Sequence, residues 1–374
     1  DVYRPLSLDE FGPPDDRRYA SVWQGLPQDR RFDVTTMHTF GNSPSAEDYL
    51  EELAVFDGLM RDYMTQRNIE GGSLAITVDG RLVLARGYTW QAPEATAFEG
   101  AVQPDSQFRI ASMAKPITAL AVMQLVEDGV LDLDTPVVDI PGIEAALGDS
   151  WADPRFDQVT PRHLLYHIAG FDRGLSPDYT VESDYDVCDA IAPNTLPTDI
   201  ARIIDYASGQ PLDHRPATHS AYSNIGYSLL GRIIEVLSDQ SYEDYVLQNV
   251  FQPIGANDTG LTGNLASEAL PKEVSYYRPN NRMTRSRLGF DDLHPLRTIC
   301  RQSNADVVLL PYGGLNLPPM DSHGGWVSSA PDLARFLVAV DQNELISGGS
   351  RSAMWARPAE RAARVLYYDA GQDT

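Results

Sequence analysis

The segment from Ile117 to Val126 constrains the fold of this chain more than any other part of it. Its sequence, ITALAVMQLV, is apolar on nearly every face of a helix. A helix without a polar face is buried, because no side of it suits water. Pro116 fits such a helix only near its start, where the first N–H groups have no acceptors within the helix. The pattern therefore predicts a central buried helix that begins close to Ser112.

Patterns on both sides of this helix predict further elements. Apolar residues recur at helical spacing over residues 46–67. Two apolar runs flank Asp79-Gly80, a strong hairpin signal, so we expect a hairpin over residues 73–88. Ser329 and Asp332 resemble a capping box at the start of a late helix. The first 45 residues are more polar, and VYRPLSL and RRYASVW in them are typical of short strands around a turn.

The charge of the chain excludes some classes of partner. The formal net charge is −24, and such an acidic surface repels nucleic acid and anionic membranes. No stretch approaches the roughly 18 uninterrupted apolar residues of a membrane span. Two origins of the acidity stay open, namely adaptation to high salt or a secreted acidic enzyme from a GC-rich genome.

Two cysteines, Cys188 and Cys300, are too few for a disulfide scaffold and too isolated for a metal site. We expect them to form one bridge, in an extracytoplasmic protein, whether secreted or periplasmic. Two buried thiols that act as small hydrophobes are the alternative. The sequence gives no sign of a metal or another cofactor.

Ser112 and Lys115 form a Ser-x-x-Lys pair at the expected start of the central helix. Residues three apart share a helix face, so the lysine reaches the hydroxyl. The helix N-terminus favours an alkoxide, and burial helps a lysine lose its proton. The pair therefore suits a nucleophile and its base. The chain has only two lysines, and a structural Lys115 satisfied by carbonyl groups is the alternative.

A second pair, Tyr222 and Asn224, lies two residues apart and ahead of another helical pattern. In an extended segment, side chains at such positions point the same way. A phenol and an amide are thereby brought to one side of the chain. A packed tyrosine beside a turn asparagine is the alternative.

Together, Ser112-x-x-Lys115 and Tyr222-x-Asn224 resemble the penicillin-recognising serine hydrolases. The Tyr-x-Asn version is similar to class C β-lactamases, D,D-carboxypeptidases of that type and family VIII esterases. The flanking segments FRIASMAKPITALAVMQLVEDGVLDLD, TPRHLLYHIAGFDRG, YSNIGYSLLGRIIE and HGGWVSSAPDLARF also resemble that superfamily. The resemblance covers about residues 51–345.

The resemblance implies an α+β fold of the β-lactamase/transpeptidase-like class. This fold has an antiparallel sheet flanked by helices and a second, mostly helical lobe. We expect residues 1–45 to be an N-terminal extension, the end of a possible tandem-repeat region, and residues 46–374 to be the catalytic domain. Its sheet lobe would comprise residues 46–125 and 320–374, and its helical lobe residues 126–319.

The resemblance also assigns roles to the two pairs. Ser112 is expected to be the acylated nucleophile, whose own N–H supplies half of an oxyanion hole. Lys115 and Tyr222 are expected to share proton transfer, with a Lys115 ammonium stabilising a Tyr222 phenolate; which of them is the base stays open. Asn224 is expected to bind the substrate, an ester, amide, peptide or β-lactam. A non-catalytic binding domain that kept the fold is the alternative.

A narrower resemblance concerns the N-terminal part. YRPLSL followed by RYASVW resembles the end of the tandem repeats that precede this catalytic domain in some bacterial proteins and in secreted fungal polyglycine hydrolases, which are endopeptidases. HIAGFDRG and DSHGGWVSSAPDL also fit that subgroup. An endopeptidase of this kind is therefore a further expectation for the substrate.

One departure from the superfamily concerns its third motif, Lys/His-x-Gly, on a strand beside the nucleophile. His323-Gly324-Gly325 matches this motif, so His323 is a candidate substrate-binding residue, but a capped helix follows it at once. We therefore expect the motif and its strands in a longer C-terminus or in a second polypeptide. Without those strands, the apolar face of the central helix would be partly open.

Overall fold

A computed structural model gives the fold of the chain. It describes residues 3–11, 18–25, 30–36, 46–91, 100–148, 151–181, 197–276, 283–285, 307–309 and 311–356. The chain divides into two compact units. The first comprises residues 1–75 and 83–104, and the second residues 76–82 and 105–374. The sequence predicts a domain boundary at residue 45, which differs from this division. That boundary stays a prediction.

The N-terminal elements follow the sequence patterns closely. Strands β1 (Tyr3–Phe11) and β2 (Arg18–Gly25) pair antiparallel, as the two expected short strands. Helix α1 spans Ala46–Arg67. Strands β4 (Gly71–Val78) and β5 (Arg81–Gln91) form the expected hairpin, and β3 (Arg31–Thr36) pairs antiparallel with β5. The turn residues Asp79 and Gly80 have φ of 51° and 76°, the two left-handed conformations of a tight hairpin turn.

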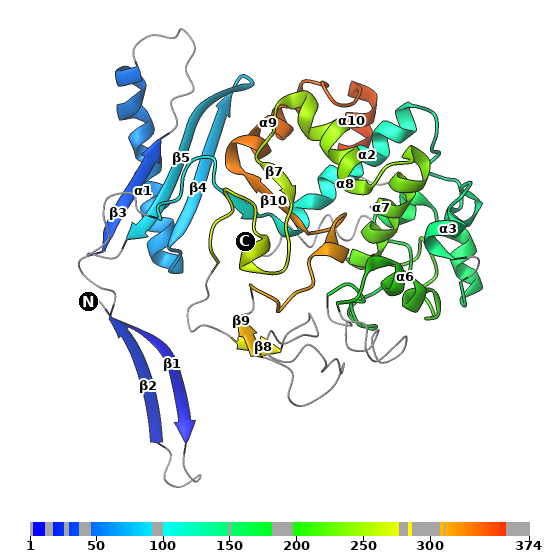
Figure 1. Ribbon diagram of the computed structural model, residues 1–374, viewed down its shortest axis with the longest axis horizontal. Coiled ribbons are helices and arrows are strands. Elements are labelled where there is room, and N and C mark those ends of the chain that lie inside the picture. Colours follow the sequence, from blue (N-terminus) through cyan, green and yellow to red (C-terminus); the bar gives the residue numbers. More distant parts are fainter. Residues whose placement is uncertain are drawn as a thin grey trace. The chain divides into compact units, whose positions relative to one another are not determined.

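The second unit contains a three-stranded sheet and most of the helices (Figure 1). The sheet has the order β6-β10-β7, and both pairings are antiparallel. Its strands are β6 (Gln107–Arg109), β7 (Thr259–Leu261) and β10 (Trp326–Ser329). A separate pair comprises β8 (Met283–Arg285) and β9 (Val307–Leu309). The α-helices are α2 (Ala114–Glu127), α3 (Glu144–Leu147), α4 (Pro161–Leu165), α6 (Ile200–Ser208), α7 (Asn224–Ser238), α8 (Tyr242–Val246), α9 (Ala330–Asp341) and α10 (Gly348–Trp355).

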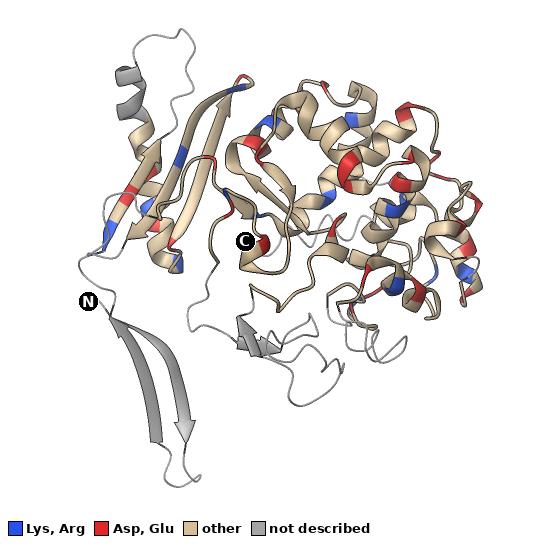
Figure 2. Ribbon diagram, viewed as in Figure 1, with Lys and Arg blue, Asp and Glu red and all other residues tan. Residues whose placement is uncertain are grey.

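Short helical turns connect these elements. The 3₁₀ turns are η1 (Ala111–Met113), η2 (Val137–Asp139), η3 (Pro154–Gln158), η5 (Gln252–Ile254), η6 (Ala266–Glu268) and η7 (Pro318–Met320), and a π-helical turn, η4, spans Leu247–Phe251. Acidic residues are spread over the helices of the second unit (Figure 2).

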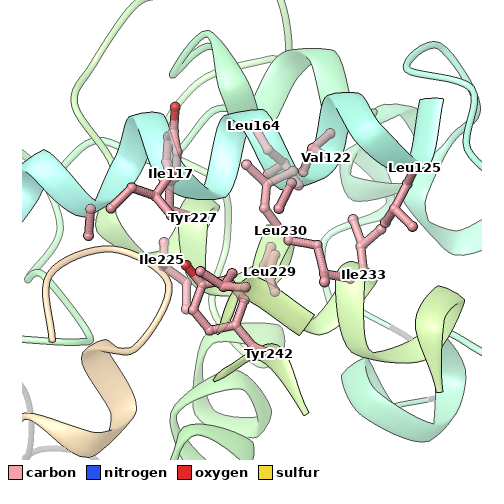
Figure 3. Packing of buried hydrophobic residues seen from close by; sticks show 14 of the residues in the cluster. Ile117, Val122, Leu125, Leu164, Ile225, Tyr227, Leu229, Leu230, Ile233 and Tyr242 are labelled. Atoms are coloured by element: carbon pink, nitrogen blue, oxygen red, sulfur yellow. The ribbon is translucent and has the colours of Figure 1, made fainter. Parts of the chain in front are cut away.

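Helix α2 is the buried central helix that the sequence predicts. Ile117, Leu120 and Val122 are 0% exposed. In Figure 3, α2 side chains face the apolar residues Leu229, Leu230 and Ile233 of α7. The expectation of a partly open face on this helix is therefore wrong, because helices of the same unit cover it. Within the part of the chain that the structure describes, no helix is long and apolar enough to cross a membrane.

Helix α9 begins at the expected cap. The Ser329 hydroxyl accepts a hydrogen bond from the Asp332 N–H at 3.2 Å. The Asp332 carboxylate accepts from the Asp258 N–H at 2.6 Å, so it joins β7 to the start of α9. Cys188, Cys300 and residues 357–374 lie outside the described residues. The bridge and the C-terminal strands remain predictions.

Candidate active site

Ser112 lies on a sharp turn between strand β6 and helix α2. It is in the 3₁₀ turn η1 and is exposed, as the expected nucleophile needs to be. The turn is held to β10 by a hydrogen bond from the Ile110 N–H to the Trp326 carbonyl at 3.0 Å. Ala111 has φ of 46°, a left-handed conformation that costs a residue with a Cβ about 1–2 kcal/mol. Such strain is concentrated at functional sites, where the surrounding structure holds it in place.

Lys115 lies in the first turn of α2, one helical turn after Ser112. The residue is buried, with 5% of its surface exposed. Its Nζ lies 3.3 Å from Ser112 Oγ, 2.7 Å from Asn224 Oδ1 and 3.0 Å from the His323 carbonyl oxygen. Burial lowers the pKa of Lys115 to about 7, with Asp178 opposing the shift and Arg173 adding to it. A substantial share of Lys115 is therefore a neutral amine at neutral pH, which is the form that can act as a base.

Tyr222 is the third side chain at this place, beside Ser112 and Lys115. Its Oη donates to Ser112 Oγ at 2.6 Å. The imidazole of His167 stacks on the phenol ring at a centroid distance of 4.8 Å, and the Arg173 guanidinium lies 4.7 Å from that ring. Burial raises the pKa of Tyr222, despite its hydrogen bond to Ser112. A raised pKa favours the phenol over the expected phenolate.

These three side chains define one direction for a proton. The Tyr222 hydroxyl donates to Ser112 Oγ, so the serine hydroxyl is free to donate in its turn. Lys115 Nζ lies 3.3 Å from the same oxygen, and in its neutral form the amine can accept that proton. A hydroxyl that gives its proton to an amine while accepting a hydrogen bond gains nucleophilic character. The arrangement is suited to attack on a carbonyl carbon by Ser112 Oγ.

Asn224 is the first residue of α7 and is 7% exposed. Its Oδ1 accepts from Lys115, and its Nδ2 donates to Asp178 Oδ2 at 2.7 Å. Both ends of the amide are thus bonded to protein groups. The side chain thereby links Lys115 to Asp178, and the contact of Asn224 with substrate stays a prediction.

His323 is placed beside Lys115 by its backbone rather than by its ring. The residue is 1% exposed, and its carbonyl oxygen is the group that contacts Lys115. Burial lowers the pKa of the imidazole to about 3, with the Lys115 charge acting in the same direction. A ring enclosed in this way cannot reach a substrate, so the structure does not support the substrate-binding role expected for His323.

The sequence profile of the family described as "Beta-lactamase" matches residues 56–371. The chain belongs to the Beta-lactamase family. Penicillin-binding protein 4 of Amycolatopsis lactamdurans is 34% identical over 217 residues, which are 57% of this chain and 48% of that protein. The chain thus spans about half the length of this curated relative. The match supports the family, whereas the polyglycine hydrolase subgroup stays a prediction.

Solved structures share the β-lactamase/transpeptidase-like fold, which confirms the expected fold class. The octameric penicillin-binding protein homologue from Pyrococcus abyssi has a TM-score of 0.56 and 25% identity, over 82% of this chain and 60% of that one. A D-amino acid amidase from Ochrobactrum anthropi SV3 has a TM-score of 0.53 and 23% identity, over 77% and 69% of the two chains. The second likeness shows the fold alone.

Sequence patterns did not predict that three further residues, His167, Arg173 and Asp178, lie around the candidate site. All three lie on the loop that follows α4. This loop is joined to the segment before Tyr222 by backbone hydrogen bonds, among them one from the His214 N–H to the Gly170 carbonyl at 3.0 Å. Gly170 has φ of 105°, and a Cβ on it would lie 2.4 Å from the His214 carbonyl oxygen. The segment HIAGFDRG was the available signal, and it marks the turn without revealing which side chains point inward.

Among the residues with described side chains, Asp172, His214 and His219 form a group that could hold a metal ion. His214 Nε2 lies 2.9 Å from Asp172 Oδ2, and His219 Nε2 lies 3.7 Å from the same oxygen. The hydrogen bond from His214 lowers the pKa of Asp172 and accounts for the close approach without a metal. This group lies beside Arg173 in sequence and includes none of the atoms around Ser112.

Proposed function

We propose that this member of the Beta-lactamase family is a serine hydrolase that forms an acyl-enzyme on Ser112. The observation that supports it most directly is the double contact of Ser112 Oγ, with Lys115 Nζ at 3.3 Å and with the Tyr222 hydroxyl at 2.6 Å. Lys115 is the general base and Tyr222 the hydrogen-bond donor. This assignment follows from the opposite pKa shifts of the two groups.

The proposed reaction proceeds in two steps. Lys115 takes the proton of Ser112 as Oγ bonds to the carbonyl carbon, and the leaving group then departs with a proton from the resulting ammonium, passed through Tyr222. Water attacks the acyl-enzyme in the second step, with the same groups exchanging the proton in reverse. The product acid leaves and Ser112 regains its proton.

We infer that the substrate is an ester, an amide or a peptide, including a β-lactam. Support comes from the curated relative, which is named as a penicillin-binding protein. Apolar side chains also lie close to Lys115, on a cavity whose lining does not include Ser112 or Tyr222. A cavity of about 310 Å³ borders Lys115 between α2, α4 and α10, and Met123, Leu165 and Met354 are among its lining residues.

The test is covalent labelling of the full chain. A fluorophosphonate and a fluorescent penicillin are incubated with the wild type and with Ser112→Ala, and the modified residue is located by mass spectrometry. We expect label on Ser112 with at least one probe and none at that position in the variant. A folded wild type whose Ser112 remains unmodified by both probes would rule out the acyl-enzyme and favour a binding domain.

The rate of acylation is expected to depend on pH through Lys115. Its pKa is lowered to about 7, so the neutral, active form is lost as the pH falls below that value. The rate should rise with pH through about 7 and then level off. His167 cannot produce this step, because burial lowers its pKa to about 3. The measurement is the rate of fluorophosphonate labelling across this range, and a flat profile would contradict Lys115 as the base.

A further inference from the structure

Asp178 is a buried carboxylate next to the groups that carry the proposed reaction. It is 7% exposed. Its Oδ1 accepts from the Thr180 N–H at 3.2 Å and from the Thr180 hydroxyl at 2.9 Å, while its Oδ2 accepts from Asn224 Nδ2 at 2.7 Å. Both oxygens therefore act as acceptors for fixed donors on opposite sides.

This carboxylate determines how the Asn224 amide is turned. An ionised carboxylate has no proton to donate, so only the NH₂ end of Asn224 can face it. The oxygen end must then point the other way, toward Lys115, where Oδ1 lies 2.7 Å from Nζ. An amide turned the other way would set its carbonyl against a carboxylate. The network admits only one orientation.

The orientation of Asn224 in turn fixes the lone pair of Lys115. A neutral amine has two N–H groups and one lone pair. Two of its three neighbours, Asn224 Oδ1 and the His323 carbonyl, can only accept hydrogen bonds. They take the two N–H groups, and the lone pair is left for the third neighbour, Ser112 Oγ at 3.3 Å. A base whose lone pair faces the nucleophile is the arrangement that proton removal needs.

We propose that Asp178 is a positioning residue of the site, which holds the Asn224 amide so that the Lys115 lone pair is presented to Ser112. The inference rests on the proposed function, in which Lys115 is the base. Asp178 is joined to Lys115 through Asn224, whose Nδ2 donates to Asp178 Oδ2 and whose Oδ1 accepts from Lys115 Nζ.

The charge of Asp178 has a second, opposite effect on Lys115. It favours the ammonium and so raises the pKa that burial lowers. Other ionisable or charged groups also face Lys115. Tyr222 lies just before α7 and Tyr227 lies in it. His167 and Arg173 lie on the loop after α4, and His323 lies before β10. Removing the Asp178 charge therefore moves the Lys115 pKa downward.

Asp178→Asn tests both effects at once. An asparagine at this position has one acceptor and must satisfy the Thr180 N–H with it, so its NH₂ faces Asn224. Asn224 then turns over and offers its own NH₂ to Lys115, where it occupies the lone pair meant for Ser112. We expect the rate of Ser112 acylation to fall by about 10²-fold, the cost of a misplaced catalytic group.

The lysine content of the chain allows a direct readout that does not depend on hydrolysis. The only lysines are Lys115 and Lys272. Lysine labelled with ¹³C at Cε gives one NMR signal from each, and the shift of each signal follows its protonation. In the wild type, we expect the midpoint of the Lys115 titration at a pH of about 7. In Asp178→Asn, we expect this midpoint at a lower pH. Lys272, which pairs with Asp105 and Asp258, is the internal control.

Asp153→Asn is the matched control for Asp178→Asn. Asp153 is a buried carboxylate, 8% exposed, that accepts from the Leu212 N–H at 2.9 Å and pairs with Arg155, away from Lys115. We expect this change to leave both the Lys115 midpoint and the acylation rate of the folded protein as in the wild type. A general effect of losing a buried carboxylate would appear in both variants.

The outcomes separate this inference from the proposed function. An unmoved Lys115 midpoint in Asp178→Asn, or acylation within threefold of the wild type, would overturn the role of Asp178. A wild type without acylation would refute the hydrolase, while the NMR titration would still decide whether Asp178 acts on Lys115. If Asp178→Asn does not fold, Asn224→Ala gives the second reading, because it also removes Oδ1 from Lys115. We expect a loss of similar size, and near-normal acylation would overturn the proposal.

Discussion

Replacing Lys115 by arginine is expected to slow the acylation of Ser112 by about 10²- to 10⁴-fold, the usual contribution of a positioned base. Arginine keeps the positive charge and the capacity to donate to Asn224 and to the His323 carbonyl. It does not lose its proton in a protein, so it cannot accept one from Ser112. The variant therefore removes the proposed base and leaves a permanent cation at the same position.

The chain supplies its own control for this substitution. Lys272→Arg makes the same chemical change at a partly exposed lysine, which is ion-paired with Asp105 and Asp258 at 2.7 Å each. We expect its labelling rate to match the wild type, since arginine can form the same ion pairs. Rates are measured with the fluorophosphonate, and folding is checked by circular dichroism. Activity of Lys115→Arg within threefold of the wild type would show that Lys115 is structural.

Tyr222→Phe is expected to reduce acylation by about 10²-fold or more, the lower end for a group that takes part in proton transfer. The change removes the hydroxyl that donates to Ser112 at 2.6 Å, and the ring can keep its stacking on His167. Ser112 Oγ then loses the donor that orients it toward Lys115.

Tyr227→Phe is the comparison for that prediction. The Tyr227 ring also lies near Lys115, at 5.5 Å from Nζ, but its hydroxyl donates to the Leu165 carbonyl at 3.2 Å. We expect the acylation rate of this variant to stay within a few fold of the wild type. Equal losses in the two variants would indicate a general effect of tyrosine hydroxyls around the lysine rather than a specific role of Tyr222.

Local patterns predicted those parts of the fold and site that are encoded within a few residues. The bounds of α1 follow from helical spacing alone, and the hairpin turn follows from Asp79-Gly80. The contact of Ser112 with Lys115 follows from one helical turn. In each case, the interacting groups are neighbours along the chain, so the geometry of one element determines the contact.

Contacts between distant segments were beyond these patterns. Asp178 lies 46 positions before Asn224, and nothing in SPDYT marks its carboxylate as the partner of an amide on another element. The covering of α2 was missed for the same reason, because α7 and α8 supply it from the second half of the chain. Tertiary packing decides both, and a single sequence carries no direct signal of it.

The burial of Lys115 has a consequence for how such a chain can evolve. Its folded pKa lies below that of an unfolded lysine, so the unfolded state binds the proton more tightly and the native state is destabilised at neutral pH. Each unit of this difference corresponds to about 1.4 kcal/mol. In a relative without the proposed activity, nothing would offset this cost, so we expect other residues at this position. Lysine at this position is therefore expected in relatives that carry out the proposed reaction.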